Sequence, residues 1–252
     1  MTFEHHEDIE TLNGNSKVWR YIALDKFADL LLNQRLFFTE IDKLPDRYER
    51  ELPPGVIASQ RKMLETEGLA SNQIEKEIQG FRDKHEERLR KCLVNCWTVD
   101  RDESYALWKT YLGGAPAGVA IRTSFSKLKR AILTRNQPDE RALYGGVVRY
   151  DYYRPNGEPT IFRLLTTKRE YYKYEKELRL FMLQPTETPV AADRIVPSSQ
   201  QPYLAVDIHS LIEDIYISPF AGQWFVNTVR QLVGTLHSGL NVRVRQSRIK
   251  ED

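Results

Sequence analysis

Hydrophobic and polar positions alternate with a period of two in some short segments and recur at three- and four-residue intervals in others. The first pattern predicts strands over 17–24, 35–41, 93–99, 118–123, 144–152, 177–184, 204–208, 214–217 and 241–246. The second predicts helices over 26–33, 103–112, 125–133, 160–172 and 220–236. These elements do not alternate in a regular strand-helix order. The pattern therefore predicts an α+β fold with a mixed, mostly antiparallel sheet and flanking helices.

Two segments differ from the rest in composition. Residues 1–16 lack an apolar pattern, which predicts a flexible N-terminal arm before a single domain over 17–252. Within that domain, residues 56–91 are highly charged but carry apolar residues at helical spacing, which predicts an inserted helical hairpin. We expect its charged residues to form a solvated face. The alternative is that this face binds another protein.

Composition limits the function classes only weakly. The 252 residues carry 37 basic and 35 acidic side chains, so nucleic-acid binding is an alternative that the charge does not favour. No run of about 18 apolar residues and no export signal is present, which predicts a cytoplasmic protein with no membrane partner. Cys92 and Cys96 have no histidine at ligand spacing, so we expect free buried thiols and no bound metal.

The segment 174–183 contains the most informative side chains. If it is a strand from Tyr174 onward, Glu175, Glu177 and Arg179 share one face with the apolar Phe181. A face that turns from charged to apolar predicts that these residues lie at the rim of a core, where a cleft would form. If both carboxylates are buried there, repulsion predicts that one of them titrates late.

Arg20 is the second informative residue, because it shares its predicted face with Val18, Ile22 and Leu24. An inward guanidinium needs an anion, either a carboxylate or an anionic ligand such as a pyrophosphate. A structural ion pair between Arg20 and a glutamate is the alternative to a ligand site.

Three other groups have simpler interpretations. Asp42, Asp46 and Glu49 match no cation-binding consensus, so turn capping is favoured over a metal site. The tyrosines and basic residues of 149–154 and 168–174 could stack nucleic-acid bases, but packing on strands is favoured. The aromatic residues with helical or strand spacing that we expect in the core are Trp97, Trp108 and Tyr111.

Several motifs occur in a fixed order along residues 17–246. They are W-R-Y (19–21), L-F-F-T-E-I-D-K-L-P-D-R-Y-E (36–49), N-C-W-T (95–98), E-S-Y-A-L-W-K-T-Y (103–111), G-V-A-I (118–121), Y-E-K-E-L-R (174–179) and Y-I-S-P-F-A-G-Q-W-F (216–225). This set resembles the bacterial domain of unknown function 2971, a family without an assigned activity. The residues 44–46 read Leu-Pro-Asp where that family more often has Asn-Asp-Pro.

The order of charged residues also resembles that of the ADP-ribosyltransferases, which place an arginine or histidine on an early strand and a glutamate, often in E-x-E, on a later one. The resemblance implies that Arg20 clamps the NAD pyrophosphate or ribose, and that Thr98 takes the place of a serine or threonine of those enzymes. It implies that Glu177 binds the nicotinamide ribose and stabilises positive charge, and that Glu175 orients the acceptor. We also expect Tyr21 and Arg179 to bind NAD.

Our leading hypothesis is therefore an NAD-using ADP-ribosyltransferase-like domain with an unknown acceptor, in a phage-conflict or toxin-like role. The alternatives are a non-catalytic binding module with a structural Arg-Glu network, and a nucleic-acid-acting enzyme with a metal between carboxylates. Geometry distinguishes them. The first places Arg20 and Glu177 on one open cleft, the second places them in direct contact, and the third brings Asp42 or Asp46 to Glu177.

Overall fold

The computed structural model describes residues 1–90, 92–113, 117–136, 142–151, 160–183, 202–240 and 242–249. Within these residues, a nine-stranded sheet has the order β1-β7-β8-β5-β2-β6-β10-β11, and β4 pairs with β5. A second, two-stranded sheet joins β3 to β9. The strands are β1 (Thr2–Phe3), β2 (Lys17–Ala23), β3 (Arg35–Phe37), β4 (Thr39–Glu40), β5 (Leu93–Val99), β6 (Gly118–Ser124), β7 (Ala142–Val147), β8 (Glu177–Leu183), β9 (Tyr203–Ala205), β10 (Asp214–Ile217) and β11 (Arg243–Gln246).

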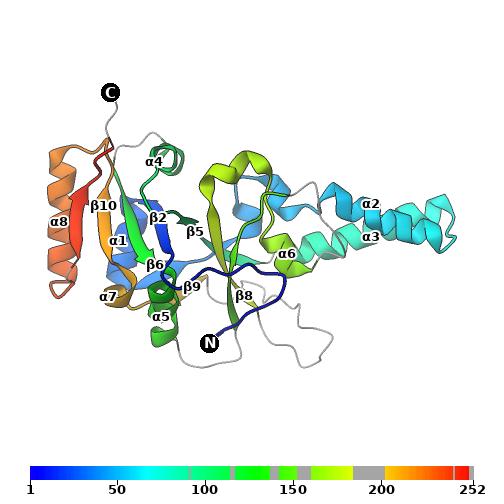
Figure 1. The fold of residues 1–252 in the computed structure, drawn as a ribbon, viewed down its shortest axis with the longest axis horizontal. Coiled ribbons are helices and arrows are strands. Elements are labelled where there is room, and N and C mark those ends of the chain that lie inside the picture. The colour runs from blue at the N-terminus through cyan, green and yellow to red at the C-terminus, as the bar shows by residue number, and fades with distance from the viewer. Residues whose placement is uncertain are drawn as a thin grey trace.

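The strand pairs confirm the predicted fold class. The pairs β1·β7 and β10·β11 are parallel. The pairs β10·β6, β2·β5, β2·β6, β4·β5, β5·β8 and β7·β8 are antiparallel. The helices are α1 (Leu24–Asn33), α2 (Pro54–Thr66), α3 (Ser71–Arg90), α4 (Tyr105–Leu112), α5 (Phe125–Arg135), α6 (Ile161–Leu165), α7 (Ile208–Leu211) and α8 (Gln223–Leu236), with 3-10 turns η1 (Ile41–Lys43), η2 (Arg47–Arg50) and η3 (Glu170–Glu175). Helices flank the sheet, and α8 lies at the opposite end of the molecule from α2 and α3 (Figure 1).

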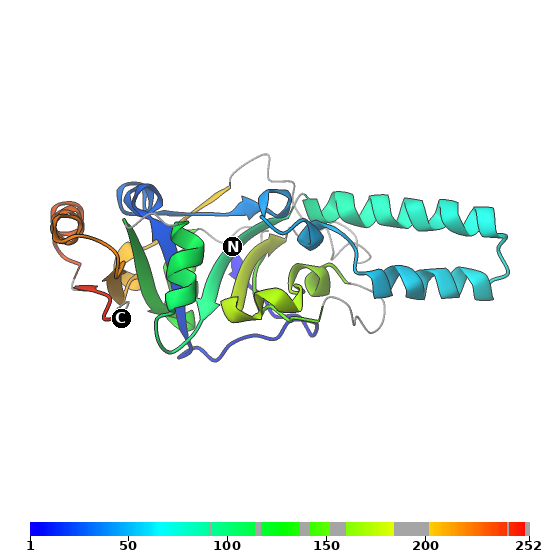
Figure 2. The ribbon, with the colours of Figure 1, turned by 90° about the horizontal axis from the view of Figure 1, so that it is seen from above.

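The predicted helical hairpin is present as α2 and α3, which project from the body side by side (Figure 2). Leu64, Ile74 and Ile78 are buried between the two helices. The same apolar cluster continues to Phe162 and Phe181, so the base of the hairpin packs on the body. Most charged side chains of the hairpin are exposed, as expected for a solvated face. A protein partner for this face stays a prediction.

Residues 1–16, which we expect to form a flexible arm, lie along the body in the structure. Strand β1 adds to the sheet by pairing with β7, and Met1 is buried in the main core. The imidazole of His6 stacks on Phe162 with ring centroids 3.8 Å apart. These apolar and ring contacts come from residues that show no periodic pattern, which is why the sequence does not reveal them.

Several predicted elements are wrong in extent. The strand predicted over 35–41 is divided into β3 and β4, which belong to different sheets, and the strand predicted over 144–152 ends at Val147 as β7. The helix predicted over 160–172 ends at Leu165, because the hydroxyls of Thr166 and Thr167 donate back to helix carbonyls and the chain turns away. The strand predicted over 204–208 ends at Ala205, because Asp207 caps α7. The loop predicted over 185–202 lies almost entirely outside the described residues. No helix of the described residues is both long and apolar enough to span a bilayer.

One pairing in the main sheet is incomplete, and it positions the site. Strands β2 and β5 each contain seven residues, yet their register pairs are Val18 with Val99 and Trp19 with Thr98. Beyond Trp19 the two strands diverge. Strand β2 stays fully paired with β6 on its other side, and β5 stays paired with β8. The sheet therefore splits between two well-supported halves.

Candidate functional site

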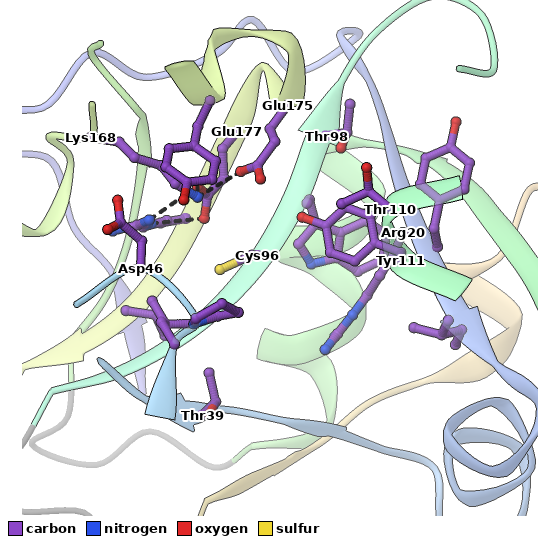
Figure 3. A pocket seen from close by; sticks show the side chains of 18 of the residues that line it. Arg20, Thr39, Asp46, Cys96, Thr98, Thr110, Tyr111, Lys168, Glu175 and Glu177 are labelled. Carbon is purple, nitrogen blue, oxygen red and sulfur yellow. Dashed lines mark hydrogen bonds and ion pairs between the residues drawn. The ribbon is translucent and has the colours of Figure 1, made fainter. Parts of the chain in front are cut away.

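A pocket of about 470 Å³ opens where β2 and β5 diverge. Its size lies within the range of about 300–1,000 Å³ that is common for small-molecule sites. Strands of the split sheet supply part of its lining and the turns over 43–49 another part, while Tyr111 of α4 and residues of η3 close its sides (Figure 3). The lining includes every residue that we predict for the site from the sequence: Arg20, Tyr21, Thr98, Glu175, Glu177 and Arg179.

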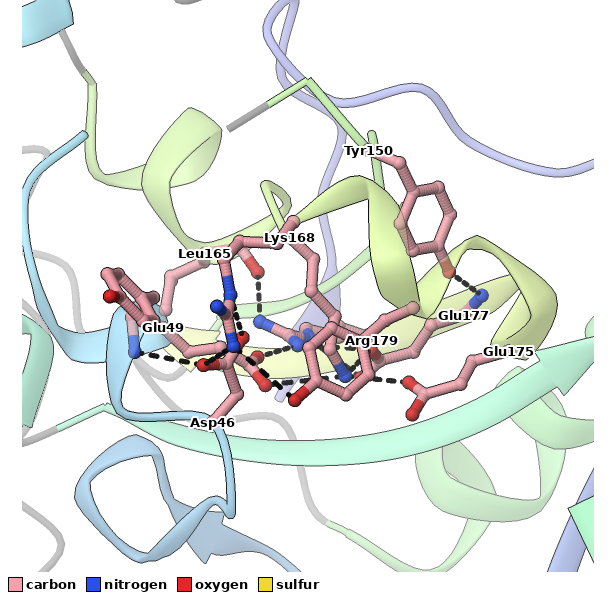
Figure 4. Close-up of polar contacts among 11 residues, drawn as sticks. Asp46, Glu49, Tyr150, Leu165, Lys168, Glu175, Glu177 and Arg179 are labelled. Carbon is pink, nitrogen blue, oxygen red and sulfur yellow. Dashed lines mark hydrogen bonds and ion pairs between the residues drawn. The ribbon is translucent and has the colours of Figure 1, made fainter. Parts of the chain in front are cut away.

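One wall of the pocket is a buried network of carboxylates and cations (Figure 4). Arg179 donates from Nε and Nη2 to the two oxygens of Glu177, at 2.8 and 3.0 Å. It also donates to Glu49. Lys168 Nζ lies 2.6 Å from Glu175, 3.3 Å from Glu177 and 3.3 Å from Glu49. Three carboxylates thus share two cations, so this wall carries an excess of negative charge when all are ionised.

The local backbone explains how two neighbouring glutamates reach one lysine. Our expectation of a strand from Tyr174 is wrong: Glu175 ends η3, Lys176 is left-handed with a φ of 43°, and β8 begins at Glu177. The left-handed residue interrupts the extended backbone between the turn and the strand, so the alternation of faces does not run from Glu175 to Glu177. Both carboxylates therefore face Lys168, although they do not lie on one strand face.

The two glutamates titrate in opposite directions, as expected for a buried carboxylate pair. Burial raises the pKa of Glu175, and the attraction of Lys168 does not fully offset this effect. Burial also opposes ionisation of Glu177, but Arg179 and Lys168 together hold the pKa of Glu177 at about 2. Glu177 is therefore ionised at neutral pH. The Cys96 thiol, whose pKa is raised by burial and by Glu177, stays protonated beside that carboxylate.

The other wall carries Arg20, and its guanidinium has no anionic partner. No side-chain hydrogen bond or ion pair joins the Arg20 guanidinium to any residue in the described part of the chain. The ring of Trp97 lies 5.8 Å from its guanidinium carbon. Burial lowers the pKa of Arg20 because little in its surroundings compensates for lost hydration. Arg20 and Glu177 thus face one pocket without contacting each other, as the first of the three hypotheses requires.

The residues of 42–49 do not form the predicted alternative metal site. Asp46 accepts the backbone N–H of Tyr48 and caps η2, which confirms the expected turn-capping role. Its carboxylate is also bound by Arg169 at 2.8 and 3.1 Å. Within the described ranges, no group of three or more His, Cys, Asp or Glu side chains is arranged to hold a metal ion.

Sequence reasoning missed several residues of the pocket. The helix predicted over 160–172 includes Lys168, so its place between the carboxylates could not be predicted. We expect Tyr111 in the core, but it is 43% exposed and lines the pocket. Trp97 and Trp108 are buried, as predicted. Cys92 is a buried free thiol as expected, whereas Cys96 is free but only partly buried.

The opposite pKa directions of Glu175 and Glu177 predict opposite effects of glutamine at pH 7. The pKa of Glu177 lies below its ordinary 4.5, so its ionised form contributes stability above that pH, about 3 kcal/mol, which is lost as pH falls toward 2. The raised pKa of Glu175 has the reverse sign, because its protonated form is favoured in the folded state. We expect Glu177→Gln to lower the free energy of unfolding at pH 7, and Glu175→Gln to raise it.

Urea unfolding at pH 7 and pH 4 checks this expectation. The increase in the free energy of unfolding of Glu175→Gln should be smaller at pH 4 than at pH 7. Most of the decrease in the free energy of unfolding of Glu177→Gln should persist at pH 4. Equal effects of both substitutions at both pH values would show that the network does not separate the two carboxylates.

Comparisons with known proteins do not assign the chain to a family. No family model and no curated protein matches the chain, so its resemblance to the domain of unknown function 2971 stays a prediction. Among solved structures, Thermus sp. 2.9 DarT in complex with NAD+ matches with a TM-score of 0.41 and 10% identity, covering 94% of this chain and 98% of that one. The same protein in complex with ADP-ribosylated ssDNA matches with a TM-score of 0.42 and 11% identity, covering 95% and 98%. TM-scores this low do not establish a shared fold.

Proposed function

We propose that the chain is an NAD-dependent ADP-ribosyltransferase-like enzyme whose site is the pocket between β2 and β5. One observation carries the proposal: a wall with excess carboxylate, including the ionised Glu177, faces a wall with the unpaired guanidinium of Arg20. An unpaired, partly buried guanidinium costs stability, and such a cost is typical of a site that receives an anion.

NAD suits this distribution of charge because it carries charges of both signs at separate positions. Its nicotinamide ring carries a positive charge, and its diphosphate carries negative charge. In the proposed complex, Arg20 binds the diphosphate, while Glu177 binds the nicotinamide ribose. Thr98 lies between them in the sheet, since it is the register partner of both Trp19 and Glu177. Tyr21 and Arg179 complete the set, Arg179 by holding Glu177 in place.

The proposed reaction replaces the bond from ribose to nicotinamide with a bond from ribose to the acceptor. Nicotinamide leaves as a neutral molecule with the bonding electrons, the ribose carbon becomes positively charged, and the acceptor nucleophile adds there with loss of a proton. The Glu177 carboxylate stabilises the developing positive charge. Glu175 orients the acceptor, and its raised pKa makes it a better proton acceptor than an ordinary carboxylate.

Incubation of the purified protein with NAD tests this proposal. We expect free nicotinamide to accumulate, as measured by chromatography, at a rate proportional to protein concentration. A matched control is Glu65→Gln, which changes an exposed glutamate of the hairpin and should release nicotinamide at the parent rate. No release above the protein-free rate, with or without candidate acceptors, would contradict an enzymatic role.

A second candidate is a binding module that holds NAD or a similar anion without turnover. It is favoured by one observation, that both oxygens of Glu177 are already engaged by Arg179. Such a carboxylate has less capacity to bind a ribose. Calorimetric binding of NAD without nicotinamide release would support this candidate over the enzyme.

A further inference from the structure

A second cavity, of about 290 Å³, adjoins the pocket between β2 and β5. The two share four lining residues, Arg20, Ile22, Lys26 and Phe37. The second cavity lies on the side of α1 and of the small sheet formed by β3 and β9. Arg20 therefore stands at a junction between two compartments and is accessible from both.

The junction carries two cations. Lys26, exposed in the first turns of α1, joins Arg20 in the lining of both cavities. Neither side chain has a carboxylate partner within the described ranges. Elsewhere the buried cations Lys168 and Arg179 are each bound to more than one carboxylate. Asp25 and Asp29 also line the second cavity, but two cations without an ion-pair partner at a junction favour a doubly charged anion such as a diphosphate.

The far end of the second cavity presents flat groups. The guanidinium of Arg35 lies 3.8 Å from the ring centroid of Tyr203, and Asp29 fixes it with hydrogen bonds of 2.7 and 3.2 Å. Phe37 is the register partner of Tyr203, and their ring centroids are 5.3 Å apart. The buried Leu36 lies in the same lining. Planar cations and aromatic rings of this kind are the groups on which nucleobases stack.

We propose that the second cavity holds the adenosine half of NAD, with the diphosphate at Arg20 and Lys26. This inference rests on the proposed function and adds the direction of the dinucleotide. The nicotinamide riboside lies toward Glu177, and the adenine lies against Phe37, Tyr203 and Arg35. The acceptor then approaches from the opposite side, where Tyr111 and Tyr174 border the first pocket.

Calorimetric titrations with NAD, AMP and nicotinamide mononucleotide test the assignment. Phe37→Ala removes a ring that is 41% exposed, so little packing is lost. Tyr203→Leu removes the second ring but keeps apolar bulk. We expect both variants to bind NAD and AMP about tenfold more weakly, while their affinity for nicotinamide mononucleotide changes less than twofold. Tyr105→Ala is the matched control, since Tyr105 is 40% exposed and lines neither cavity.

The outcomes separate this inference from the proposed function. If the parent protein binds NAD but both variants bind NAD and AMP like the parent, the second cavity is not the adenosine site. The assignment also fails if the variants lose as much affinity for nicotinamide mononucleotide as for NAD, because the dinucleotide would then lie in the reverse direction. If the parent protein binds no NAD, the proposed function and the inference fail together.

Discussion

Replacing Glu177 with glutamine is expected to lower the rate of nicotinamide release from NAD by at least about 10²-fold. The loss is of the order seen when one preorganised electrostatic stabiliser is removed from an active site. Glutamine keeps the shape of the side chain, but it cannot offset positive charge on the ribose carbon. Steady-state measurements at saturating NAD check this, because the effect is on kcat and not only on KM.

The stability of the same variant has to be measured beside its activity. Glu177 accepts hydrogen bonds from Arg179 within a buried network, and losing such charge-assisted bonds costs about 1.5–3 kcal/mol. The measured rate is therefore divided by the fraction of folded protein, which circular dichroism gives. Unchanged turnover in a folded Glu177→Gln variant would falsify the catalytic role of this carboxylate.

Replacing Arg20 with methionine is expected to weaken NAD binding about 10- to 100-fold, the loss that follows when charge-assisted hydrogen bonds to a phosphate are removed. Its effect on stability should be unusual for a partly buried residue. Because the guanidinium has no partner within the described residues, its loss removes a desolvated charge and leaves no carboxylate unpaired. We expect the free energy of unfolding to stay the same or to rise.

Arg179→Met is the matched comparison for this substitution. It removes the same chemical group from β8, but there it leaves Glu177 and Glu49 as buried carboxylates short of a partner. Breaking a buried pair in this way costs about 3–5 kcal/mol. Thermal unfolding of both variants, with calorimetry of NAD binding, separates the two roles. A loss of stability in Arg20→Met as large as that in Arg179→Met would assign Arg20 to the structure and not to a ligand.

Much of the fold could be predicted from the sequence because its strands carry strong local patterns. The strand predicted over 93–99 is β5 with the same bounds, and 214–217 is β10. The helical hairpin followed from apolar residues at helical spacing in a charged segment. The helix predicted over 160–172 failed, since its end depends on the hydroxyls of Thr166 and Thr167, which local propensity treats as neutral.

The site could be predicted in part, for a different reason. A charged residue on an otherwise apolar strand face marks a place where the core meets a cleft, and this rule selected Arg20, Glu177 and Arg179. The split between β2 and β5 could not be predicted, because strand pairing depends on contacts between distant segments. Lys26, Lys168 and Tyr111 enter the site only through that split and the turns around it.

A crystal structure of the protein grown with NAD tests the central claim most directly. We expect NAD in the pocket between β2 and β5, with a diphosphate oxygen within hydrogen-bond distance of the Arg20 guanidinium and the nicotinamide ribose beside Glu177. An empty pocket at saturating NAD, with Arg20 turned to pair with one of the protein's own carboxylates, would contradict the account.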